Sequence, residues 1–187
     1  AAHRDHPRPT RAKVDRAPAG PPQGVLPSHL GGNRWVQEWG NIYPLVAPAG
    51  GAKTADIGAL LRAKNTDVQG MVKYGENFFV SLGFAPLPAT FWERSQFTKP
   101  RDREVVCHAS AWDLDDKDDV RVKMCLSITG EDFVTAHHEL GHNFYQRAYK
   151  NQPFLFRTGA NDGSHEAIGH AIALSITPGS LHQAGLL

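Results

Sequence analysis

The stretch AHHELGH, residues 136–142, constrains this chain more than any other, because it predicts a helix and a chemistry together. His138 and His142 are four positions apart, so on a helix their imidazoles project from one face, one turn apart. That is the spacing of two ligands on a tetrahedral zinc ion, and Glu139 lies beside them within reach of zinc-activated water. The alternative interpretation is a helix that holds this pattern by chance, in a chain with 10 histidines.

The residues around the motif predict a long helix over 129–150. Thr129 and Asp132 have the spacing of a capping box at its start, with aspartate in place of the usual glutamate or glutamine. One stripe of side chains recurs at helical spacing and predicts the face that packs against the rest of the protein: Phe133, His137, Leu140 and Phe144.

A catalytic zinc site has three protein ligands, and the segment 161–177 offers the third. This segment is a second predicted helix, which Pro178 ends. Asp162, Glu166 and His170 share one face of it. We favour Glu166 as the ligand, because it lies within the helix rather than at its start. A solvated surface carboxylate is the alternative interpretation.

Further helices are expected over 33–46, 54–64 and 66–84, but between 103 and 126 the apolar period changes to two. The runs REVVCHASAW and VRVKMCL flank an acidic turn and predict a hairpin. If its centre is Asp116, Cys107 and Cys125 face each other. Facing β-carbons lie about 4.5–5.5 Å apart, so a small adjustment would allow a disulfide. Two free thiols are the alternative, and a disulfide would indicate an oxidising compartment.

The composition of the 187-residue chain excludes several classes of protein. Its net charge of +1 does not suggest a protein that binds nucleic acid. No apolar run is long enough to span a bilayer, and residues 1–24 lack the apolar stretch of a secretory signal. Residues 1–24 are rich in Pro, Arg and Ala, so we expect a disordered tail, with a basic interaction arm as the alternative.

Three longer stretches resemble the angiotensin-converting-enzyme family of zinc peptidyl-dipeptidases. They are SLGFAPLPATFWERSQFTKPRDREVVCHASAWD, AHHELGHNFYQ and GANDGSHEAIG. The stretches HELGHNFYQ and LSITPGSLHQAGLL are more similar to bacterial members than to animal ones. The resemblance runs from about Gly24 to Leu187 and is specific, because the motifs occur in order and at the family's separations.

The resemblance implies a mainly α gluzincin-type fold with one small β-hairpin beside the zinc helix. It implies one zinc ion on His138, His142 and Glu166, with Glu139 as general base and then general acid. It also matches Cys107 and Cys125 to a disulfide of the family, and it implies an extracytoplasmic location.

The family's substrate is a peptide with a free C-terminus, from which a dipeptide is released. The resemblance makes His108 and Ala109 substrate contacts on the edge of the CHASA strand. It makes Gln37 a residue that helps to hold the substrate's carboxylate. From the sequence alone, a plain surface residue is the preferred interpretation of Gln37. For His108, a partly buried strand histidine is an equally good interpretation. Chloride dependence occurs in some members of the family.

The chain departs from the family pattern in three ways. His170 replaces an aspartate that accepts a hydrogen bond from a ligand histidine, and Ser164 replaces an aromatic residue. Family domains are also longer, so we expect residues 25–187 to be a partial domain that lacks the groups for the carboxylate and the oxyanion. The alternatives are an inactive zinc-binding fragment, an incompletely folded product, and a thermolysin-like zinc peptidase.

Overall fold

The computed structural model describes residues 43–47 and 55–187, and the chain divides into two compact units, 1–54 and 55–187. In the first unit, helix α2 spans Tyr43–Val46, at the end of a segment predicted as helix. Gln37, the rest of that predicted helix and the predicted tail lie outside the described residues. Among the helices that the structure describes, none has the length and apolarity to cross a membrane.

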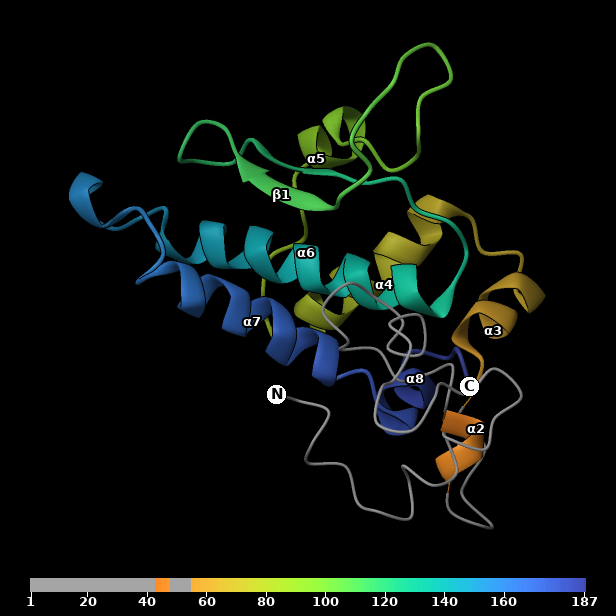
Figure 1. Ribbon diagram of the computed structural model, residues 1–187. Coiled ribbons are helices and arrows are strands. Elements are labelled where there is room, and N and C mark those ends of the chain that lie inside the picture. Colours follow the sequence, from red (N-terminus) through yellow and green to blue (C-terminus); the bar gives the residue numbers. More distant parts are fainter. Residues whose placement is uncertain (1–42, 48–54) are drawn as a thin grey trace, which may run out of the picture. The chain divides into compact units, whose positions relative to one another are not determined.

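The second unit is mainly helical with one two-stranded hairpin, as predicted (Figure 1). Its elements follow in the order α3 (Ile57–Ala63), α4 (Val68–Ser81), α5 (Ala89–Arg94), β1 (Ser110–Asp113), β2 (Val120–Lys123), α6 (Gly130–Tyr149), η3 (Phe154–Phe156), α7 (Asp162–Leu174) and α8 (Pro178–Gln183). Helices α5 and α8 and the turn η3 were not expected from the sequence.

Helix α6 is the central element of this unit, because it contacts α3, α4, α7 and both strands. Figure 1 shows it between the hairpin and α7. The stripe predicted from helical spacing is buried, and Phe144 stacks on Phe79 of α4 with ring centroids 3.9 Å apart. Each buried side chain of this size stabilises the fold by about 1.5–3 kcal/mol. One face of α6 therefore anchors the core: Phe133, His137, Leu140 and Phe144.

Polar side chains cap the N-terminal ends of α4, α6 and α7. Asp67 and Asn161 accept hydrogen bonds from the third residues of α4 and α7, and Thr129 does the same at α6. The capping box predicted at α6 is not closed, however. Aspartate is one methylene shorter than glutamate, and the Asp132 carboxylate accepts from the Ser127 N–H at 2.7 Å instead.

The predicted end of the last long helix is wrong. Helix α7 stops at Leu174, and Pro178 opens α8 instead of terminating α7. Proline lacks an N–H, and the first helical position needs none, so this residue type fits the start of a helix well. Gly169 is the one residue of α7 that is fully buried, so this helix is more exposed than its alanines and isoleucines suggest.

The hairpin differs in register from the prediction. Ser110 lies opposite Lys123 and Asp113 opposite Val120, so the centre falls between residues 116 and 117 rather than at Asp116. The acidic turn explains the shift, because Asp113 and Asp115 accept five backbone N–H bonds within it. Turn geometry of this kind sets the register of the strands.

Cys107 and Cys125 form a disulfide, although they do not face each other within the ladder. Both lie beyond the paired strands, with Cα atoms 5.2 Å apart. The strand expected to begin at residue 103 begins only at Ser110, so Cys107, His108 and Ala109 form an extended lead-in to β1. The disulfide ties this lead-in to the segment that enters α6.

The two edges of the hairpin have different neighbours. The backbone of Gln96 bonds Val122 and Met124 and so covers the outer edge of β2. In the part of the chain that the structure describes, β1 pairs with β2 alone, which leaves its other edge open. The side-chain amide of Asn143 on α6 donates to Gln146 Oε1 at 2.9 Å, and its nitrogen also lies 3.4 Å from Trp112 O and 3.3 Å from Arg121 O, so it contacts both strands of the hairpin.

Helices α6 and α7 approach closely at two glycines. A β-carbon on Gly141 would lie 3.0 Å from the Cα of Gly169. A β-carbon on Gly169 would lie 2.7 Å from Cε1 of the His138 ring, closer than real contacts allow. A side chain at position 141 would press on the backbone of α7, and one at position 169 would press on the ring of His138, so the close crossing favours glycine at both positions.

We expect removal of the disulfide to destabilise the protein by about 3 kcal/mol, because the closed loop restricts the unfolded chain. The test is urea unfolding of the parent and of the Cys107→Ser, Cys125→Ser double variant, each with and without a reductant. The reductant should lower the stability of the parent alone. Two alkylatable thiols in unreduced protein, detected by mass spectrometry, would contradict the disulfide.

We expect Gly169→Ala to lower the free energy of unfolding by about 1–3 kcal/mol, the usual cost of overpacking. Gly179→Ala in α8 is the matched control, because its new β-carbon would meet nothing closer than Thr177 Oγ1 at 3.8 Å. The control should leave stability unchanged or raise it. Equal urea midpoints for Gly169→Ala and the parent would show that the crossing accommodates a side chain at this position.

Candidate metal and catalytic site

The crossing of α6 and α7 brings the three predicted zinc ligands together. Nε2 of His138 lies 3.3 Å from one carboxylate oxygen of Glu166, and Nε2 of His142 lies 3.6 Å from the other. The two Nε2 atoms are 3.0 Å apart. Two ligand atoms at about 2.0–2.1 Å from a tetrahedral zinc are about 3.3–3.4 Å apart. The donor set therefore fits this metal in chemistry and in spacing.

A second set of possible ligands overlaps the first. Ligand atoms of His138, Glu166 and His170 all lie within 4.8 Å of one another. The set with His142 is the better match, because its distances of 3.0–3.6 Å bracket the tetrahedral spacing. His170 sits one turn beyond Glu166 on α7, with its ring 4.9 Å from that of His138. It therefore lies beside the candidate site.

Both histidines of the motif favour the neutral form that binds metals. Burial is the main cause that lowers the pKa of His138, and it also lowers the pKa of His142, which the neighbouring His138 lowers further. Only a neutral imidazole has a lone pair free for coordination. Glu166 is 58 % exposed, so it is solvated on one side, yet its carboxylate faces both histidines on the other.

Glu139 is buried on the same side of α6, with 7 % of its surface exposed. Burial raises its pKa to about 7, and the negative charge of Glu166 adds to the rise. A carboxyl group with a pKa near the working pH is suited to accept and then return a proton. The residue next to the metal ligand therefore has the property that general acid–base catalysis needs.

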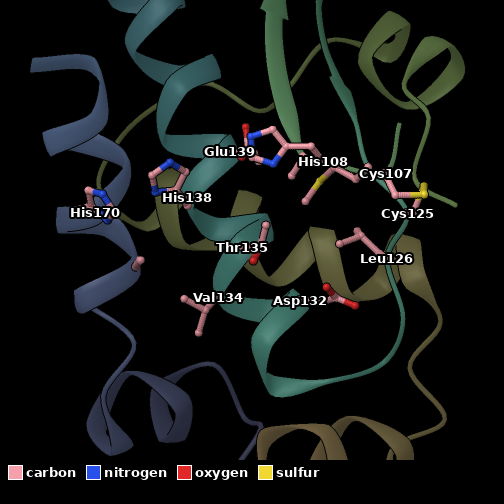
Figure 2. A pocket seen from close by; sticks show the side chains of 13 residues that line it. Cys107, His108, Cys125, Leu126, Asp132, Val134, Thr135, His138, Glu139 and His170 are labelled. Atoms are coloured by element: carbon pink, nitrogen blue, oxygen red, sulfur yellow. A yellow bond between two sulfur atoms is a disulfide. The ribbon is translucent and has the colours of Figure 1, made fainter. Parts of the chain in front are cut away.

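Two cavities meet at these residues. The first, about 450 Å³, extends from His170 past His138 and Glu139 to the disulfide, as Figure 2 shows. The second, about 520 Å³, runs along the open edge of the hairpin. The residues common to both are His108, Ala109, His138 and Glu139. The predicted substrate contacts His108 and Ala109 thus lie on a groove that passes the candidate metal site.

His165 was not predicted from the sequence as a site residue. Its Nδ1 lies 2.8 Å from Nδ1 of His142, and its Nε2 lies 3.4 Å from the Tyr149 hydroxyl. The only signal in the sequence is its place directly before Glu166, which gives no reason to pair it with a residue 23 positions away. Asn143 was also missed, because its role depends on the position of the hairpin against α6.

The comparisons with known proteins point to one family. Residues 15–187 match the family model described as angiotensin-converting enzyme, so the match begins inside the segment predicted as a tail. The chain is 50 % identical over 167 residues to angiotensin-converting enzyme of Bos taurus, and 47 % identical to that of Sus scrofa. It is 45 % identical over 166 residues to angiotensin-converting enzyme of Haematobia irritans exigua.

The matched segment is 88 % of this chain in each case, but only 13 % of the two mammalian proteins and 27 % of the fly protein. The chain therefore spans a small part of the length of these relatives. The family model nevertheless covers nearly all of it, and the site residues lie within the matched range. This protein belongs to the angiotensin-converting enzyme family.

Proposed function

We propose that this chain carries the zinc site and the general base of a peptidase that releases dipeptides from the C-termini of peptides. The observation that supports this most is the convergence of His138, His142 and Glu166 at tetrahedral spacing. Family membership supports the reaction class. We also propose that residues 25–187 form part of the peptidase domain, and that the chain is more similar to bacterial members of the family than to animal ones.

A zinc ion held there would supply a Lewis acid that polarises the scissile carbonyl and acidifies water. Glu139 would accept the proton of the attacking water and then pass it to the leaving amine. Burial of the carboxyl, which raises its pKa, favours the return of the proton to the leaving amine. Glu166 and the two histidines would hold the metal, and the absence of a side chain at Gly169 leaves room for the His138 ring.

The peptide is proposed to lie along the open edge of β1. Main-chain groups at a strand edge bind extended peptides without regard to their side chains. His108 and Ala109 line both cavities and would contact the peptide next to Glu139. Gln37 is also proposed to help to hold the substrate's carboxylate, but it lies outside the residues that the structure describes. The disulfide and the family support an extracytoplasmic location.

The described residues that line the two cavities include no lysine and no arginine. A substrate's C-terminal carboxylate therefore has no cationic partner in them. This favours the second candidate function, a zinc-binding module that catalyses poorly on its own.

The zinc assignment predicts one zinc ion per chain. We expect His138→Ala or His142→Ala to abolish binding and Glu166→Ala to weaken it, because each removes one donor. His182→Ala is the control, since this exposed histidine on α8 bonds the Leu187 carbonyl and should not affect the metal. Elemental analysis after dialysis measures the content. Equal zinc in the parent and the double histidine variant would refute the site.

We expect the chain alone to hydrolyse peptides at a trace rate or not at all. The described residues that line the two cavities include no lysine or arginine to hold the substrate's carboxylate, and each oxyanion donor that a peptidase site lacks costs about 10²–10³ in turnover. The assay is a quenched-fluorescence peptide with a free C-terminus, run with Glu139→Ala and with the C-terminally amidated peptide as controls. Rapid release of dipeptides that Glu139→Ala abolishes would show that the described groove is complete.

We expect His170→Asp to tighten zinc binding by about 10–100-fold, because an anionic acceptor next to His138 strengthens the ligand. His170→Asn is the control that offers an acceptor without the charge. Competition with a chelator gives both affinities. Unchanged or weaker binding in His170→Asp would mean that this histidine does not act through His138.

A further inference from the structure

We propose that His165 is a positioning residue for the metal site: its Nδ1 accepts a hydrogen bond from Nδ1–H of His142 and so orients that ligand. The inference rests on the zinc site proposed above and extends it to a residue that the metal would not touch. The two nitrogens are 2.8 Å apart, the distance of a good hydrogen bond.

The direction of this bond follows from proton counting. A neutral imidazole carries one N–H. If Nε2 of His142 faces Glu166 and serves as a ligand atom, its proton must be on Nδ1. Nδ1 of His165 must then be the acceptor, and the proton of His165 must be on Nε2. That N–H points to the Tyr149 hydroxyl, 3.4 Å away, so all three residues have consistent roles.

The ring of His165 is held in this orientation by its surroundings. Tyr145 packs on it with centroids 4.8 Å apart, and the Tyr145 hydroxyl accepts from the Ala160 N–H at 3.1 Å. On another side, a β-carbon on Gly159 would lie 2.8 Å from the ring, so only glycine leaves room for it there. The acceptor is therefore placed in advance, and ordering it costs little when the metal binds.

Metal-binding histidines usually donate their second N–H to a carboxylate, a carbonyl or water. Here a neutral imidazole takes that place, which fixes the tautomer of His142 without adding negative charge. Removing such a partner typically weakens metal binding about 10–100-fold. We expect a loss of this size when the acceptor at His165 Nδ1 is lost.

Three substitutions separate the acceptor from the volume of the side chain. His165→Asn places an amide oxygen near the position of Nδ1, so it should keep the zinc affinity close to that of the parent. His165→Gln places its polar group near the position of Nε2 and leaves His142 without an acceptor. His165→Phe keeps the ring and removes both nitrogens. The last two should each weaken zinc binding about 10–100-fold.

The zinc dissociation constant of each variant is measured with a chromophoric chelator, and the visible spectrum of the cobalt form reports the ligand geometry. Circular dichroism and the melting temperature identify variants that fail to fold. The inference is supported if His165→Asn keeps its zinc affinity while His165→Gln and His165→Phe lose it. Affinity retained in Phe and lost in Asn would assign His165 to packing and overturn it. Equal affinity in all three would overturn it as well. No zinc in the folded parent would overturn the proposed function itself.

Discussion

The close approach of α6 and α7 at Gly141 and Gly169 is the contact on which the candidate site depends. A β-carbon on Gly141 would press on the backbone of α7, and a β-carbon on Gly169 would press on the ring of the metal-ligand candidate His138. Glu166 lies on α7, three residues before Gly169, and it meets the two histidines of α6 only because the helix axes come so near. The missing side chains of two glycines thus determine whether three donors on two helices can surround one ion.

One face of helix α6 packs in the hydrophobic core, and another carries the residues of the candidate site. Its apolar stripe packs into the core and fixes the rotation of the helix, and this rotation turns His138, Glu139 and His142 toward the hairpin and α7. The same burial raises the pKa of Glu139 and lowers the pKa of both histidines. Core packing therefore positions the functional groups and also shifts their pKa values.

The contacts around the site join side chains whose positions in the sequence give no reason to pair them. His165 meets His142 across the helix crossing, and Asn143 contacts two strands from the centre of α6. The hairpin was expected from alternation, but its register was off by one residue because hydrogen bonds within the acidic turn decide it. The disulfide was expected as well, although the geometry used to argue for it was not the observed one.

The sequence by itself determined the helical class, the stripe that is buried on α6, the hairpin and the pair of histidines one turn apart. These follow from local periodicity, since residues three, four or two positions apart must share a face. Only the tertiary structure decided that Glu166 reaches both histidines, that His165 and not His170 bonds His142, and that the lead-in to β1 borders the groove. Such contacts join residues far apart in the chain, and their distances depend on how closely two packed helices and a strand edge approach. That is set by side-chain volume at a few positions, above all by the two glycines of the crossing.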